Sequence, residues 1–183
     1  MLNRLEIQRP KHEQLEEIGN LFEITIKHTF EKESIHDPLF EEITKIVQGL
    51  KDTLKRDLDS KGKEEYFLIA ILDQQVVGTI AYGPPNSMIT ENVEGIDSVA
   101  PEVKCVYILP SMQGMGVGSF LFEKIKEVLT GQKIDNFYLD SGYKLAQAFW
   151  QRKLGTADII LKDFWGLNNS HMIWYRPSNS SAP

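Results

Sequence analysis

The sequence has little cysteine, no long apolar run and no excess of basic residues. Its 183 residues include one cysteine, Cys105, so no intramolecular disulfide can form, and the cysteine and histidine spacing of a zinc site is missing. No apolar stretch approaches the roughly 20 residues that span a bilayer. Charges within the first nine residues do not suit a signal peptide. We therefore expect a cytoplasmic chain with no membrane partner and no metal.

Acidic residues outnumber basic ones by 26 to 20, which gives a net charge of −6. Non-specific binding of nucleic acid requires a basic face, so we expect no nucleic-acid partner. The hydrophobic share of 42% is ordinary for a globular protein, and the length suits one folded core. We expect a single domain over residues 1–177 and a disordered tail over residues 178–183.

One stretch, residues 104–129, combines a short strand, a glycine-rich loop and a helix. Cys105–Leu109 is apolar, with β-branched and aromatic residues typical of a strand. The loop carries three alternate glycines, at Gly114, Gly116 and Gly118. A helical apolar pattern begins at Val117. This order directs backbone N–H groups and the positive end of a helix at one point, which suits a phosphate, and glycine lets an anion approach the backbone.

Periodicity predicts the remaining elements. We expect strands at 5–9, 66–72, 76–82, 101–109, 137–140, 157–162 and 172–176, and helices at 11–30, 37–58, 117–131 and 145–154. Asp37 and Pro38 suit the start of the second helix, and residues 87–100 are expected to be irregular. The apolar side chains of the last helix are expected to face the core: Leu145, Ala146, Phe149, Trp150 and Leu154. The order predicts an α+β (mixed α/β) domain with one central mixed, mostly antiparallel sheet of about seven strands, flanked by about four helices.

The glycine spacing excludes two nucleotide-binding loops. The dinucleotide fingerprint G-x-G-x-x-G would need a glycine at Ser119 or at Leu121. A P-loop needs a lysine and then serine or threonine after its last glycine, and Gly118 is followed by Ser119 and Phe120. The remaining pattern is Q-x-x-G-x-G, which begins at Gln113 and follows an apolar strand.

This pattern resembles the GNAT superfamily of acyl-CoA-dependent N-acetyltransferases, which carries [Arg/Gln]-x-x-Gly-x-[Gly/Ala] at the start of the helix after its fourth strand. The order of expected elements is similar to that of the family over about residues 5–177. A later stretch with Ala146, Phe149, Trp150 and Gly155 is similar to the family signature A-x-x-[aliphatic/aromatic]-Tyr-x-x-x-Gly. The resemblance implies a GNAT-like single domain.

The resemblance implies acetyl-CoA as acyl donor. The pyrophosphate would lie on the N–H groups of the glycine-rich loop, and the pantetheine arm would pair with the fourth strand, which splays from the fifth in the family, often at a bulge. The implied cofactor-binding residues are Val106, Tyr107, Ile108, Gln113, Gly114, Met115, Gly116, Val117, Gly118, Ser119, Phe149 and Trp150. The alternative is that the glycines serve only a tight turn.

The implied reaction is direct attack of a neutral amine on the thioester. It needs alignment of the substrates, a base, and an N–H donor for the carbonyl oxygen, which we expect near Ile108. Glu102, which begins the fourth strand, is the candidate base, directly or through water. Relatives carry a tyrosine that acts as the general acid where this chain has Trp150, and an indole cannot usefully donate a proton. Tyr143 is the candidate replacement, unless it is only an exposed tyrosine or the thiolate leaves without an acid.

Other reactive side chains are expected to be structural. Cys105 lies in the middle of a strand and suits a buried core thiol. His28, His36 and His171 are isolated in the sequence, although His36 lies in the loop that often lines the acceptor site in the family.

We expect an N-acetyltransferase that acts on a primary amine of a small molecule or peptide. The oligomeric state stays open, and a homodimer is one of the alternatives. Two other classes stay open. One is an acyl-CoA-binding module that has lost catalysis, which the substitution at Trp150 motivates, and the other is a partner-binding scaffold.

Overall fold

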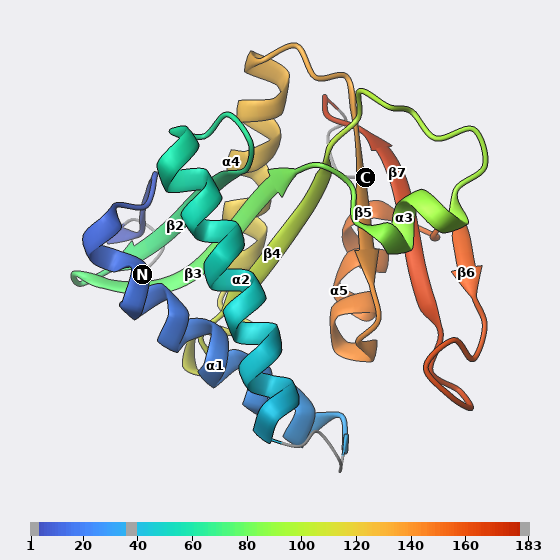
Figure 1. Ribbon diagram of the computed structural model, residues 1–183, viewed down its shortest axis with the longest axis horizontal. Coiled ribbons are helices and arrows are strands. Elements are labelled where there is room, and N and C mark those ends of the chain that lie inside the picture. The colour runs from blue at the N-terminus through green and yellow to red at the C-terminus, as the bar shows by residue number, and fades with distance from the viewer. Residues whose placement is uncertain (1–3, 36–39, 180–183) are drawn as a thin grey trace. The chain divides into compact units, whose positions relative to one another are not determined.

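The computed structural model describes residues 4–35 and 40–179. Its strands are β1 (Glu6–Gln8), β2 (Tyr66–Leu72), β3 (Gln75–Gly83), β4 (Glu102–Ile108), β5 (Asn136–Ser141), β6 (Ile159–Leu161) and β7 (His171–Pro177) (Figure 1). Its helices are α1 (Leu15–Lys32), α2 (Phe40–Ser60), α3 (Ser87–Asn92), α4 (Val117–Gly131) and α5 (Lys144–Leu154), with the 3₁₀ helices η2 (His12–Gln14) and η3 (Pro110–Met112). The expected helix start at Asp37 and Pro38, and the loop residue His36, lie outside the described residues.

The strands form one sheet in the order β1-β2-β3-β4-β5-β7-β6. Neighbours run antiparallel from β1 to β3, and β7 runs antiparallel to both β5 and β6. β4 and β5 are parallel and pair at Glu102 and Tyr138. The predicted α+β class, with a mixed and mostly antiparallel sheet of seven strands, is therefore confirmed.

Within the described residues there are five α-helices, one more than predicted. The additional helix is α3, in the segment that we expected to be irregular. Asn86 caps it, because its Oδ1 accepts a hydrogen bond from the Ile89 backbone N–H at 3.0 Å. A six-residue polar helix has too little apolar periodicity to be predicted from its own sequence.

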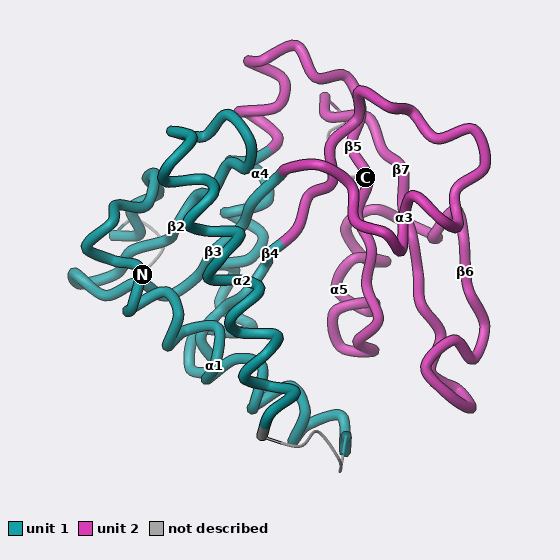
Figure 2. Tube along the Cα trace, viewed as in Figure 1, with its two compact units in different colours: residues 1–82, 105–125 teal, residues 83–104, 126–183 magenta. Residues whose placement is uncertain are grey.

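The chain divides into two compact units, shown in Figure 2. Unit 1 comprises Met1–Tyr82 and Cys105–Ile125, and unit 2 comprises Gly83–Lys104 and Lys126–Pro183. The chain passes from unit 2 to unit 1 within β4, so the first residues of this strand belong to one unit and the last residues to the other.

The core of unit 1 is built from the apolar faces of its helices and strands. α1 and α2 pack against each other, and α2 also contacts β2. Fully buried side chains include Ile18, Phe22, Leu54, Phe67, Ile69, Ile80 and Leu121. Burial of each such side chain contributes about 1.5–3 kcal/mol to the stability of the folded state. This core therefore holds in place the strand that precedes the glycine-rich loop.

The core of unit 2 lies around β5 and β7. Its central cluster is formed by Ile89, Ala100, Tyr138 and Ile173. Trp174 is completely buried, and its indole N–H donates to the Gly155 carbonyl oxygen at 2.9 Å. Ser178, the first residue of the expected tail, is buried, and its N–H donates to the Asp135 carbonyl oxygen at 2.8 Å.

The structure corrects two local predictions. Leu145 was expected to face inward, but it is 54% exposed, because Gln147 and Trp150 form the buried face of α5. Leu145 lies two residues before Gln147, about 200° around the helix. The strand expected at residues 157–162 is shorter, since the chain turns at Asp163, where φ is +52°.

Candidate functional site

The loop predicted to bind a phosphate, Gln113–Gly118, joins η3 to α4 in unit 1 and is called the glycine loop below. Gly114 and Gly116 have φ values of +76° and +89°, in the left-handed region that favours glycine. Gln113 ties the loop to the preceding strand, because its Nε2 donates to the Ile108 carbonyl oxygen at 3.1 Å. Two of the three glycines are therefore required by the backbone conformation itself.

α4 begins at Val117, so the last two residues of the glycine loop belong to its first turn. Its first turn includes a hydrogen bond of 3.0 Å from the Phe120 N–H to the Gly116 carbonyl oxygen. The N–H groups of residues 117–119 precede this bond, so the helix itself offers them no acceptor. Val117 and Leu121 are buried and fix the direction of the helix. These N–H groups and the helix dipole favour an anion at this position.

β4 changes conformation at Cys105, where φ is +53°. This value is uncommon for a residue with a Cβ and is typical of a bulge or a strained site. The Thr79 hydroxyl on β3 donates to the Cys105 carbonyl oxygen at 2.7 Å and so holds the residue in place. The Cys105 side chain is half-buried rather than a core thiol as predicted, because the strand kinks here. A kink agrees with the bulge that the family resemblance implies for the fourth strand.

The end of β4 presents backbone groups at the edge opposite β3. The Leu109 N–H bonds to the Val77 carbonyl oxygen on β3 at 3.0 Å. N–H groups of successive residues in a strand point to alternate edges, so those of Ile108 and Val106 point away from β3. Gly78 on β3 allows the close packing of this segment, since a Cβ there would lie 2.7 Å from Ile108 Cδ1. The residues expected to pair with pantetheine therefore have suitably directed N–H groups.

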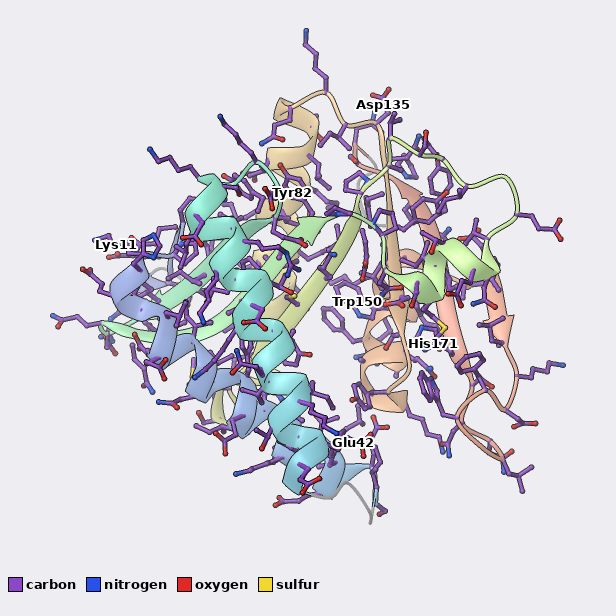
Figure 3. The ribbon with its side chains drawn as sticks, viewed as in Figure 1. Lys11, Glu42, Tyr82, Asp135, Trp150 and His171 are labelled. Carbon is purple, nitrogen blue, oxygen red and sulfur yellow. The ribbon has the colours of Figure 1, made fainter. Side chains whose placement is uncertain are left out.

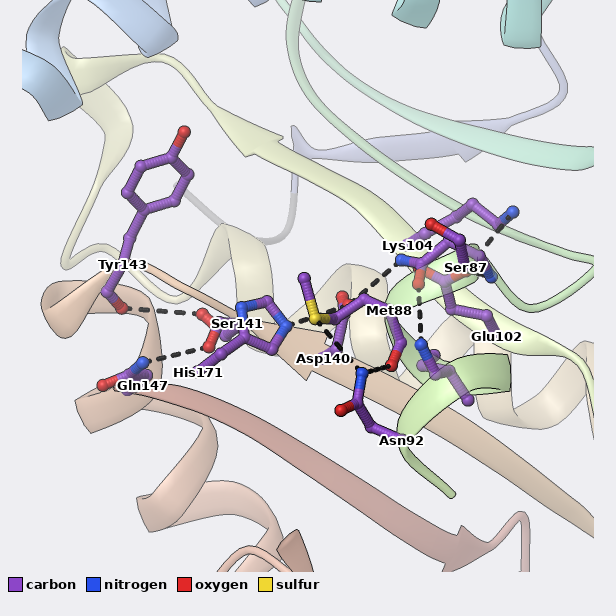
Figure 4. A network of polar contacts seen from close by, with 12 residues as sticks. Ser87, Met88, Asn92, Glu102, Lys104, Asp140, Ser141, Tyr143, Gln147 and His171 are labelled. Carbon is purple, nitrogen blue, oxygen red and sulfur yellow. Dashed lines mark hydrogen bonds and ion pairs between the residues drawn. The ribbon is translucent and has the colours of Figure 1, made fainter. Parts of the chain in front are cut away.

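Unit 2 contains a group of linked polar side chains around Glu102, called the carboxylate network below, part of which is drawn in Figure 4. Its members are Asn86, Glu102, Lys104, Asp140, His171 and Trp165. Glu102 is 3% exposed, and both of its oxygens accept hydrogen bonds from Asn86, from the backbone N–H at 2.8 Å and from Nδ2 at 3.1 Å. The candidate base is therefore fixed in one orientation.

Burial raises the pKa of Glu102 from 4.5 to about 7. Lys104, whose Nζ lies 3.5 Å from Oε2, lowers this pKa, and the nearby carboxyl group of Asp140 raises it. A pKa near neutrality suits a general base, because the group can both take up and release a proton at pH 7.

Of the network, only Glu102 was predicted as a site residue. Asp140 Oδ2 lies 3.0 Å from His171 Nε2, and it also accepts from Asn86 Nδ2 at 3.0 Å. His171 Nδ1 accepts a hydrogen bond of 3.0 Å from the indole N–H of Trp165. In the sequence, Asp140 stands out only as an aspartate at the end of an apolar strand. No spacing pattern links it to His171, which lies 31 residues further along the chain.

The other predicted residues of unit 2 lie elsewhere. Tyr143 precedes α5, and Figure 4 shows its side chain pointing away from Ser141 and His171. Trp150, labelled in Figure 3, is buried, and its ring packs edge-on against Phe149 with centroids 4.7 Å apart. The structure therefore brings Glu102 together with Asp140 and His171, and not with Tyr143.

No group of three or more metal-ligating side chains occurs in the part of the chain that the structure describes. Among the described residues, no helix is long and apolar enough to cross a membrane.

Comparison with known proteins places this fold. The model of the Acetyltransferase (GNAT) family matches residues 29–156, more than half of the chain. No curated protein sequence matches. A similar solved structure is the PaiA N-acetyltransferase of Thermoplasma acidophilum in complex with coenzyme A, with TM-score 0.69 and 16% identity over 94% of this chain and 99% of that one.

Two further structures have the same fold. A putative GNAT acetyltransferase from Desulfovibrio desulfuricans gives TM-score 0.70 and 16% identity over 95% of this chain and 99% of that one. The ribosomal-protein-S18-alanine N-acetyltransferase of Escherichia coli gives TM-score 0.65 and 11% identity over 97% and 96%. The glycine loop, the kinked fourth strand and the family match lead to one conclusion: the chain belongs to the GNAT family of acetyltransferases and is an acyltransferase.

Proposed function

We propose that this enzyme transfers the acetyl group of acetyl-CoA to a primary amine of a small molecule or peptide, by direct attack in a ternary complex. The observation that carries the proposal is the glycine loop, in which two glycines with positive φ lead into the start of α4. The pyrophosphate of acetyl-CoA would accept hydrogen bonds from the N–H groups of residues 113–119. The pantetheine arm would lie along Val106–Ile108, and Phe149 and Trp150 are proposed as further cofactor-binding residues.

In the proposed reaction the amine nitrogen attacks the thioester carbonyl carbon and the carbon–sulfur bond breaks. The N–H of Ile108 would donate to the carbonyl oxygen as its negative charge develops. Glu102 would take the proton of the attacking amine. Since Glu102 is almost fully buried, we assign this transfer to an intervening water. Tyr143 would give its proton to the departing sulfur.

We propose further that one domain over residues 1–177 carries the activity, in the cytoplasm and without a metal. A second candidate function is acyl-CoA binding without turnover. It is favoured by Trp150, a buried indole that stands where relatives have the tyrosine that acts as the general acid. Both functions predict that acetyl-CoA raises the melting temperature, and only the first predicts release of free CoA thiol with an amine.

The test is thiol release from acetyl-CoA with a panel of amines: polyamines, aminoglycosides, arylalkylamines, amino acids and peptide N-termini. Gly118→Glu is compared with Gly131→Glu, which adds the same charge at the other, exposed end of α4. Gly118→Glu should weaken acetyl-CoA binding at least about 100-fold, a loss of about 2.7 kcal/mol, because a carboxylate would face the pyrophosphate. Gly131→Glu should bind as the wild type does. Equal affinity of the two variants would remove the proposed site, and binding with no turnover on any amine would favour the second function.

A further inference from the structure

A continuous chain of hydrogen bonds in unit 2 links an exposed aromatic residue to the buried candidate base. It begins at Trp165, which is 56% exposed, and passes through His171 to Asp140. Asn86 then joins Asp140 to Glu102. The proposed function uses only the last member, and the remaining residues have no role in it.

The Trp165 indole fixes the proton on His171. An indole N–H can only donate, so Nδ1 of His171 must accept. The imidazole is then neutral and carries its proton on Nε2, which donates to the Asp140 carboxylate at 3.0 Å. A second proton on Nδ1 would point directly at the indole hydrogen. The surface residue therefore keeps a negative charge on Asp140 that His171 does not neutralise.

Asn86 transmits this arrangement to Glu102. Its Oδ1 accepts from the Ile89 N–H, so its Nδ2 group must face the two carboxyl groups. The two hydrogens of Nδ2 then reach Asp140 Oδ2 at 3.0 Å and Glu102 Oε1 at 3.1 Å. One amide group bridges both acids and holds them close to each other in a buried site, where their charges interact strongly.

Gly142 makes room for the surface end of the chain. A Cβ on Gly142 would lie 2.9 Å from Trp165 Nε1 and 3.1 Å from His171 Nδ1. The absence of a side chain therefore permits the indole N–H to reach the buried imidazole.

We propose that Trp165, His171 and Asp140 are positioning residues that act on Glu102 through Asn86. The inference rests on the proposed function, since it assigns these residues to the base of that reaction. The charged groups around Glu102 are Lys104 on its own strand and Asp140 on β5, with His171 on β7 behind Asp140. Of these, Asp140 raises the pKa of Glu102, and the Trp165 bond determines whether His171 can neutralise Asp140.

The test is an NMR titration of the ¹³C-labelled Glu102 carboxyl group in the wild type and in Trp165→Phe. The variant keeps an aromatic ring and removes the N–H, so His171 can take a second proton and pair with Asp140. We expect the titration midpoint of Glu102 to fall by about half a pH unit or more. The matched control is Phe164→Leu, which removes the neighbouring exposed ring, 4.9 Å away, and leaves the indole bond intact. Its midpoint should equal that of the wild type.

A midpoint in Trp165→Phe equal to the wild-type value overturns the proposal, as does a shift of the same size in Phe164→Leu. The ¹⁵N shifts of His171 in the wild-type protein provide a second measurement that needs no variant. They should show the proton on Nε2, and a proton on Nδ1 would overturn the proposal. Neither experiment uses acetyl-CoA or an acceptor. Absence of turnover therefore counts against the proposed function alone, and an unshifted midpoint against the positioning chain alone.

Discussion

Glu102→Gln should change both the pH dependence of stability and the rate of acetyl transfer. The pKa of Glu102 is about 7 in the folded protein and 4.5 in a reference peptide. The folded state therefore binds this proton more tightly than the unfolded state, so ionisation of Glu102 lowers the free energy of unfolding as pH rises from about 4.5 to 7. The linkage relation gives a loss of about 2.5 kcal/mol between pH 5 and pH 8.

Glutamine cannot ionise, so this loss should be absent in the variant. Glutamine also offers only one acceptor to the two Asn86 donors, which costs about 1–1.5 kcal/mol at every pH. The difference in stability between variant and wild type should therefore move by about 2.5 kcal/mol in favour of the variant between pH 5 and pH 8.

The assay is urea unfolding followed by tryptophan fluorescence at pH 5 and pH 8, with Glu94→Gln, an exposed carboxylate of the same unit, as control. The constant cost of the lost hydrogen bond cancels when the two pH values are compared. A change below about 1 kcal/mol, or one of opposite sign, would refute the account of Glu102 as a carboxyl group destabilised by burial. Turnover of Glu102→Gln should fall by about 10²–10⁴, and an unchanged rate would remove Glu102 as the base.

Two further predictions concern Tyr143 and Gly78. Tyr143→Phe should slow turnover by about 10–100-fold and remove the alkaline limb of the pH–rate profile, because the departing sulfur loses its proton donor; an unaltered profile would exclude that role. Gly78→Ala should lower the free energy of unfolding by about 1–3 kcal/mol in urea titrations, since the new Cβ would lie 2.7 Å from Ile108 Cδ1 and 3.3 Å from the Tyr107 carbonyl oxygen. Gly49→Ala, where a Cβ meets nothing within 4 Å, should stabilise α2 by about 0.5–1 kcal/mol, and equal effects of the two substitutions would contradict the close packing inferred at Gly78.

Local sequence patterns were sufficient for most of the fold. β2 has the predicted bounds, Tyr66–Leu72, because a continuous apolar run is flanked by polar turn residues. The glycine loop was also predictable, since its spacing reflects backbone angles that favour glycine at Gly114 and Gly116. α3 was missed because its start depends on a single capping residue, Asn86.

The carboxylate network could not be predicted in the same way. Asn86 lies 54 residues from Asp140 in the chain, and their hydrogen bond depends on how β4, β5 and the turn after β3 fold together. Glu102 was named as a candidate from its place at the start of a strand, whereas its raised pKa follows from burial, which only the structure provides. Single residues in unrelated segments carry no spacing signal, so His171 was read as an isolated structural histidine.

The central claim is that the glycine loop binds acetyl-CoA through its backbone N–H groups. The most direct test follows the ¹⁵N amide resonances of residues 113–119 while acetyl-CoA is added to the wild-type protein. The account predicts saturable shifts that are largest at Gly114, Gly116 and Gly118, with smaller shifts at Val106 and Ile108. Saturating acetyl-CoA that leaves the loop amides unchanged would contradict it.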